Sequence, residues 1–183
     1  MNIKPIDLNN AVILDTETTG LDNQAEICEI AVIEAETGKT ILDTLIKPGC
    51  TIPDEVIRIH GITNDMVTDA PIYSDIHHQL VDIFRDKMVI IYNADFDLRM
   101  IRQSSALSDP TKKQLTGSII CAMKWYAEFY GHRSNYRGSF KWQKLIDAAR
   151  QQHIDVSDLK AHRALADCVI TRRTIESVNR KLK

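Results

Sequence analysis

The stretch that decides the fold reads VILDTETTG at residues 12–20. Its apolar start, over residues 11–14, is typical of a central strand covered on both faces. Because side chains alternate along a strand, the two acids that end this run, Asp15 and Glu17, point to the same face. Two such carboxylates repel, so one should be protonated unless a cation lies between them. Carboxylate oxygens are hard ligands that suit Mg²⁺ or Mn²⁺, so the pair could bind such an ion. The alternative to a metal site is that both acids simply reach solvent beyond the end of the strand.

The rest of the chain alternates between strand and helix patterns. Further strands are expected at residues 26–34, 40–46, 88–92 and 118–121, and helices at residues 53–59, 73–84, 123–130 and 141–151. Another helix is expected to be capped near Asn93. A last helix has apolar or small residues spaced three and four apart from Leu165 to Leu182. Three strands followed by strand–helix alternation predict an α/β domain with a mixed sheet, and residues 1–183 are expected to form one domain.

The composition is that of a globular protein, with 44% hydrophobic and 26% charged residues, and it excludes a disordered or membrane chain. No secretory signal is visible and four cysteines lack any C-x-x-C pair, which favours idle thiols in a reducing cytoplasm over a zinc site. The net charge of −2 hides an asymmetry, since residues 124–183 hold 13 Lys and Arg against 6 Asp and Glu. This asymmetry predicts a basic binding surface, although solvated charged helices would also produce it.

Two further groups of polar residues follow later in the chain. Residues 93–97 read NADFD, in which Asn93 and Asp97 are four apart and share one helical face. The alternative to a functional role is that Asp97 lies in the first turn because the helix dipole stabilises an acid there. Residues 162–167 read HRALAD; five helical steps leave the side chains of His162 and Asp167 about 140° apart. The two can therefore reach one site only if His162 lies in a loop or first turn before the helix.

These segments together resemble a known family. The run DTETTGL at residues 15–21, NADFD and HRALAD are similar, in order and context, to the three exonuclease motifs of the DEDD superfamily. The histidine places the resemblance in the DEDDh branch, and the superfamily contains proofreading exonucleases. One departure is Tyr92, where histidine is common; it puts fine positioning in doubt more than activity. The motifs span residues 15–167, most of the chain.

The resemblance implies a ribonuclease H-like fold, with a mixed five-stranded sheet flanked by helices. It implies a metal-dependent 3′→5′ exonuclease that releases nucleoside 5′-monophosphates with two divalent cations, Mg²⁺ or Mn²⁺. Four carboxylates would hold the ions: Asp15, Glu17, Asp97 and Asp167. By family analogy His162 would take a proton from the attacking water, and imidazole is a competent base near neutral pH.

The resemblance also implies where substrate binds. Backbone groups around Thr18, Thr19 and Gly20 would lie near the terminal sugar, and Leu21 would act as a wedge against a base. The alternative is that Gly20 makes a turn and Leu21 packs in the core. Asn93 is expected beside the substrate on the same helical face as Asp97.

A second candidate substrate contact is the segment at residues 131–144, GHRSNYRGSFKWQK. It contains four Lys or Arg, three aromatic residues and no acid. Cations neutralise phosphates and aromatic faces stack on unpaired bases, so Arg133 and Arg137 are expected to bind single-stranded nucleic acid. The alternative is a solvated loop that runs into a helix, with Phe140 and Trp142 packed partly inward.

Several functions stay open at this point. The expected partner is a nucleic acid with a free 3′ end, with DNA and single strands favoured and a role in DNA repair or replication. One rival is an RNA-trimming member of the same branch, similar to ribonuclease T or oligoribonuclease; another is a catalytically silent nucleic-acid-binding or polymerase-accessory module. All five catalytic positions are filled, which favours an enzyme. The chain ends soon after its last helix, so a free-standing nuclease is expected rather than a dedicated proofreading subunit, and a polymerase or other protein partner is not evident.

Overall fold

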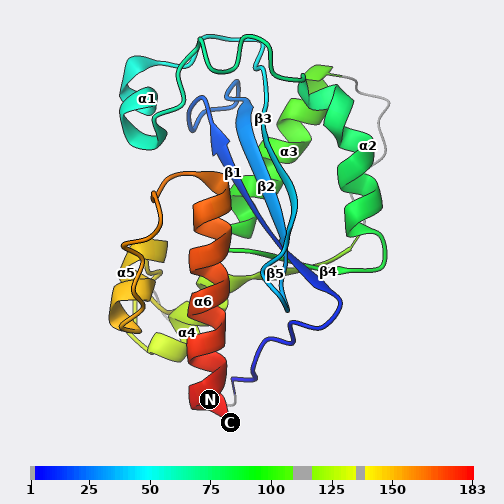
Figure 1. Ribbon diagram of the computed structural model, residues 1–183. Helices are drawn as coiled ribbons and strands as arrows, with labels where there is room; N and C mark the ends of the chain where they lie inside the picture. Colours follow the sequence, from blue (N-terminus) through cyan, green and yellow to red (C-terminus); the bar gives the residue numbers. More distant parts are fainter. Residues whose placement is uncertain (1–2, 109–116, 135–138) are drawn as a thin grey trace.

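A five-stranded mixed sheet forms the centre of the computed structural model, which describes residues 3–108, 117–134 and 139–183 (Figure 1). The strands lie in the order β3-β2-β1-β4-β5. Their bounds are Ala11–Thr18 for β1, Ile27–Glu34 for β2, Thr40–Leu45 for β3, Met88–Ile91 for β4 and Ser118–Cys121 for β5. The pairings β3-β2-β1 are antiparallel, whereas β4 runs parallel to β1 and β5 parallel to β4. The expected mixed five-stranded sheet of a ribonuclease H-like fold is confirmed.

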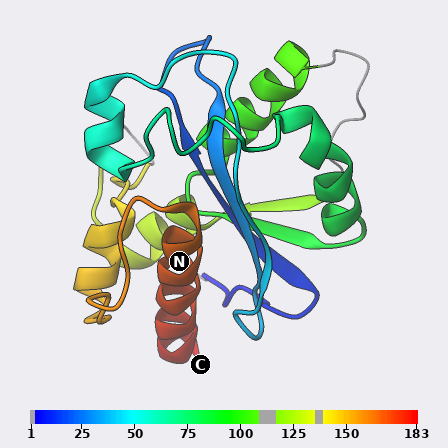
Figure 2. The same ribbon diagram turned by 45° about the horizontal axis from the view of Figure 1, so that its top comes forward.

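Six helices accompany the sheet within the described residues: α1 Asp54–His60, α2 Tyr73–Phe84, α3 Ala94–Ser108, α4 Ala122–Tyr130, α5 Leu145–Gln151 and α6 Ala164–Leu182. Helices α2 and α3 cover one face of the sheet and α4, α5 and α6 the other, as Figures 1 and 2 show. The sides are assigned by the alternation of β1. Val12 and Leu14 pack with α2 and α3, while Ala11 and Ile13 pack with α4 and α6.

Strand β1 runs past the end of its parallel neighbour. The pairing with β4 ends at Leu14↔Ile91, while the pairing with β2 continues to Thr18. Asp15 to Thr18 therefore have a backbone neighbour on one side only. By alternation, Asp15 and Glu17 lie on the α6 side and Thr16 on the α3 side.

One expected helix begins later than predicted. The helix expected at residues 141–151 begins at Leu145. The preceding residues pair with an earlier segment instead, since Lys141 N–H donates to the His132 carbonyl and Arg133 forms a bridge with Phe140. A local helical pattern was overridden by this pairing between neighbouring segments.

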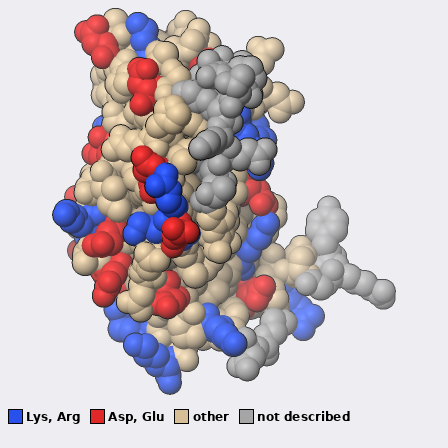
Figure 3. Space-filling view, turned by 90° about the vertical axis from the view of Figure 1, so that its right-hand side faces the viewer, with Lys and Arg blue, Asp and Glu red and all other residues tan. Residues whose placement is uncertain are grey.

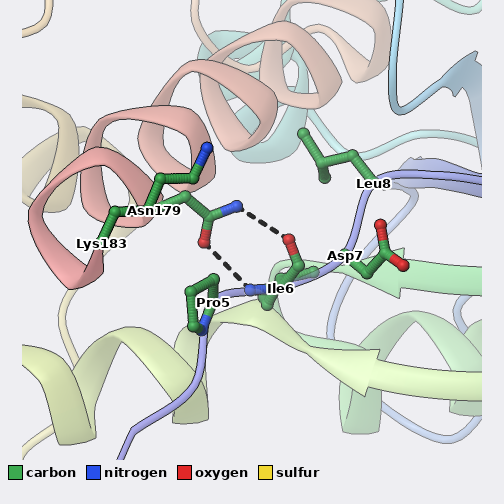
Figure 4. Close-up of a pocket in the computed structure, with 6 residues that line it drawn as sticks. All are labelled: Pro5, Ile6, Asp7, Leu8, Asn179 and Lys183. Carbon is green, nitrogen blue, oxygen red and sulfur yellow. Dashed lines mark hydrogen bonds between the residues drawn. The ribbon is translucent and has the colours of Figure 1, made fainter.

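The start of the chain is held against the end of α6. The Asn179 amide accepts a hydrogen bond from Ile6 N–H at 3.0 Å and donates one to the Ile6 carbonyl at 2.8 Å (Figure 4). Ile6 and Asn179 also line a pocket, together with Pro5, Leu8 and Lys183. This segment thereby leads into β1, whose far end carries the acids.

The surface and the helices bear on two other expectations. Basic and acidic side chains are interspersed over the face shown in Figure 3, so on that side the charge asymmetry of the sequence does not gather into one basic patch. Over residues 3–108, 117–134 and 139–183, no helix has the length and apolar character needed to cross a bilayer.

Candidate metal and catalytic site

Three carboxylates from two elements converge at the end of β1. Asp15 and Glu17 come from the strand, and Asp167 comes from the first turn of α6. One oxygen from each lies within 4.8 Å of the others, and within the described part of the chain no other such group of His, Cys, Asp or Glu occurs. The acids meet Asp167 because they share the strand face that packs against α6. This donor set fits a hard divalent cation.

The fourth expected acid, Asp97, approaches from the other side of the sheet. It lies in the first turn of α3 and is only 3% exposed. The Thr16 hydroxyl donates a hydrogen bond of 2.8 Å to its Oδ1. Thr16, which lies between Asp15 and Glu17 but points to the α3 side, therefore holds Asp97 in place. It lies outside the group of three but close enough for its charge to raise the pKa of Asp15.

Burial and mutual repulsion make these acids retain protons. Burial, together with the neighbouring carboxylates, raises the pKa of Glu17 to about 8 and holds the pKa of Asp15 well above its usual range. Burial raises the pKa of Asp97 to about 7 against the opposing hydrogen bond from Thr16, and it also raises the pKa of Asp167. A divalent cation would replace these protons and relieve the repulsion. The electrostatics therefore fit a metal site better than a surface acidic cluster.

His162 satisfies the geometric condition that its spacing from Asp167 imposes. It is exposed and lies in the loop before α6, two residues ahead of the first helical residue, Ala164. Its backbone N–H donates to Asp167 Oδ1 at 3.3 Å, which ties the histidine to the carboxylate cluster. The backbone φ of His162 is 59°, in the left-handed region that non-glycine residues seldom adopt. The expectation of a histidine in a loop before the last helix is confirmed.

The loop after β1 presents Leu21 to solvent. Leu21 is 77% exposed, so the alternative that it packs in the core is excluded. Thr18 Oγ1 donates to the Gly20 carbonyl at 2.8 Å, and Thr19 N–H donates to the Glu26 carbonyl at 2.8 Å, which closes the loop. Helix α3 holds it from outside, because Arg99 donates to the Leu21 carbonyl at 3.1 Å. The exposed leucine is thus carried on a braced loop.

Other predicted contacts have different surroundings. Asn93 is half-buried directly before α3, and its carbonyl accepts hydrogen bonds from the N–H groups of Phe96 and Asp97. Arg133 is exposed, whereas Arg137 lies outside the described residues. Tyr92, the departure from the family pattern, is buried.

The Tyr92 side chain braces the basic segment. Its hydroxyl donates to the Gln143 carbonyl at 2.9 Å. Trp142, beside that carbonyl, is 62% exposed and so does not pack inward. Tyr92 therefore links the end of β4 to the chain before α5, a role that no single motif indicates.

Sequence reasoning missed one buried ion pair. Glu29 lies on β2 opposite Glu17 and pairs with Arg163, the residue after His162. A signal was present: Glu29 is the one charge in the apolar run at residues 27–33, and a buried carboxylate needs a partner. The identity of that partner was not readable from the sequence.

Comparisons with known proteins agree with this geometry. A model of the family described as "Exonuclease" (RNase_T) matches residues 12–174. An "Uncharacterized exonuclease CP81" of Escherichia phage 186 is 42% identical over 174 residues, covering 93% of this chain and 88% of that protein. The DNA polymerase III subunit epsilon of Rickettsia typhi is 33% identical over 156 residues, covering 80% and 68%. A solved structure, exonuclease X in complex with 5′ overhanging duplex DNA, matches with a TM-score of 0.68 and 29% identity over 93% of this chain and 92% of that one. The chain therefore belongs to the RNase T-type exonuclease family, in the histidine-bearing branch of the DEDD superfamily, and is a 3′→5′ exonuclease that hydrolyses phosphodiester bonds.

Proposed function

We propose that this exonuclease shortens DNA from free, single-stranded 3′ ends and releases nucleoside 5′-monophosphates. The observation that carries the proposal is the convergence of Asp15, Glu17 and Asp167 within 4.8 Å, with buried Asp97 beside them. DNA is favoured over RNA because relatives above 25% identity bear DNA in their names or complexes. A merely accessory role is disfavoured, since all five catalytic positions are filled.

Two divalent cations, Mg²⁺ or Mn²⁺, are the proposed cofactors. Asp15, Glu17 and Asp167 would hold one ion, and Asp97 would help to hold the second. When bound, such ions supply Lewis-acid stabilisation of phosphate charge and lower the pKa of a water.

The protein's own groups are assigned to proton transfer and positioning. His162 would accept the proton of the attacking water, whose oxygen bonds to phosphorus as the bond to the 3′ oxygen breaks. The exposed Leu21 would stack against the last base, and Asn93 with residues Thr18 to Gly20 would line the terminal sugar. The braced loop supplies the rigidity that such positioning needs.

The direct test is a cleavage assay with matched 5′-labelled DNA and RNA oligonucleotides in Mg²⁺, Mn²⁺ or EDTA. We expect a ladder of shortened labelled DNA, weaker RNA shortening, and no ladder in EDTA or with Asp15→Asn. Asp95→Asn, which changes an exposed acid of α3, is the control and should stay active. Activity that survives EDTA or Asp15→Asn would exclude the metal mechanism, and faster RNA shortening would exclude the DNA preference.

The general-base role is tested by His162→Ala. We expect kcat to fall roughly 10²- to 10⁴-fold, the range for loss of a positioned base, with Mn²⁺ affinity retained. His153→Ala is a matched control because His153 is also exposed and also has a positive φ, 56°. Full activity of His162→Ala would remove this residue from the chemistry.

The basic segment is tested by the double substitution Arg133→Ala and Arg137→Ala. If both arginines neutralise phosphates, KM for a single-stranded oligonucleotide should rise. The slope of log affinity against log salt should fall in magnitude by about 1.4, or 0.7 per phosphate. Arg85→Ala with Arg180→Ala removes the same charge from other exposed sites. An equal effect of the two pairs would argue against a binding role.

The raised pKa values predict how stability depends on pH. Unfolded carboxyls have a pKa of about 4. Burial raises the pKa of Asp97 to about 7 and that of Glu17 to about 8 in the folded protein. Between about pH 4 and pH 8 the folded protein therefore binds more protons than the unfolded chain does. In EDTA, the contribution of these carboxyls to the free energy of unfolding should therefore fall as the pH rises from 5 to 8. Mn²⁺ should stabilise most at pH 8. Urea unfolding measures this, with Glu17→Gln plus Asp97→Asn as the variant whose slope should flatten; an identical slope in that variant would contradict the assignment.

A further inference from the structure

A buried acid adjoins the carboxylate cluster without joining it. Glu29 lies on β2 directly opposite Glu17, and opposite residues of an antiparallel pair project to the same face. It is only 2% exposed, yet it is not a member of the group formed by Asp15, Glu17 and Asp167. An isolated buried carboxylate is costly, so its partners explain its presence.

Both oxygens of Glu29 are bound by the start of α6. Arg163 Nε lies 2.9 Å from Oε1 and 3.1 Å from Oε2, and the Arg163 Nη2 group also donates to Oε1. The first helical N–H, that of Ala164, donates to Oε2 at 2.8 Å. This carboxylate therefore satisfies the helix terminus and a guanidinium fork together.

The pair fixes the chain on the far side of His162. Arg163 is the N-cap residue of α6 and directly follows His162, whose own N–H is bound by Asp167. The histidine is thus held between two carboxylates, Glu29 acting through the next residue and Asp167 acting directly. The left-handed φ of His162 lies between these two attachments.

We propose that Glu29 and Arg163 are positioning residues that hold His162 in its reactive orientation, an inference that rests on the proposed general-base role of His162. A buried ion pair is weak evidence for stability, because well-packed apolar substitutes often serve as well. Its fork geometry does fix orientation. The pair also occupies Glu29, which otherwise would present a further free carboxylate beside Glu17.

The test is a double-mutant cycle between Arg163→Met and His162→Ala, read as kcat and KM on a 5′-labelled single-stranded DNA oligonucleotide in Mn²⁺. Displacement of a reacting group by about 1 Å costs up to roughly 10²-fold, so Arg163→Met should lower kcat about 10- to 100-fold. KM and Mn²⁺ affinity should stay within about twofold. In the His162→Ala background Arg163→Met should lower kcat no further, because the base through which it acts is gone. Arg163→Lys, which keeps the charge without the fork, should restore part of kcat.

Arg173→Met is the matched control. Arg173 lies within α6, makes a two-pronged pair with Asp158 at 2.8 and 2.7 Å, and has a side chain that is 32% exposed against 31% for Arg163. It should keep wild-type kcat. If Arg163→Met does not fold, Glu29→Gln with Arg163→Met removes both charges and leaves an amide oxygen to accept the Ala164 N–H; this variant should show the same loss of kcat.

The outcomes separate this inference from the proposed function. Additive losses of kcat in the cycle, an equal loss in Arg173→Met, or wild-type kcat in the variants of the pair would overturn the positioning role while leaving His162 as the base. Full activity of His162→Ala alone would instead overturn the base assignment and the inference with it.

Discussion

The site depends on one feature of the sheet: β1 is longer than the parallel strand beside it. Because β4 stops at Ile91, opposite Leu14, the last residues of β1 keep a strand neighbour only on the β2 side. The chain leaving β4 turns into α3 there and brings Asp97 to the uncovered edge. Because side chains alternate along β1, Asp15 and Glu17 face α6, whereas Thr16 faces α3. One strand thereby collects acids from both helical layers.

Holding like charges together is the cost of this arrangement, and several contacts limit it. Thr16 donates to Asp97, and the backbone of His162 donates to Asp167. Arg163 forms an ion pair with Glu29 and so offsets the negative charge of that carboxylate. Burial and the repulsion that is left raise the pKa values of Asp15 and Glu17, so the metal-free cluster retains protons. Strain of this kind concentrates at functional sites, where activity and stability conflict.

The sequence was sufficient where the decisive relations were local. Strand alternation predicted that Asp15 and Glu17 share a face, and helical rotation required His162 to precede the last helix; both are confirmed. Pairings between separate segments were out of reach. The pairing of residues 132–133 with 140–141 shifted the start of α5 to Leu145, and Glu29 meets Arg163 across 134 positions. No periodicity encodes which distant segment satisfies a buried charge.

Both helices that supply acids begin at the site, and this shared orientation has an electrostatic consequence. Asp97 and Asp167 each lie in a first turn, where the aligned N–H groups of the helix carry partial positive charge. These termini offset part of the carboxylate repulsion. Helix α3 also holds the loop of Leu21 through Arg99, so one helix carries Asp97 and braces the exposed leucine. Helix α6 does the same for Asp167 and the turn of His162. Rigid helices, rather than the loops themselves, therefore set the spacing between the carboxylate cluster and the exposed Leu21.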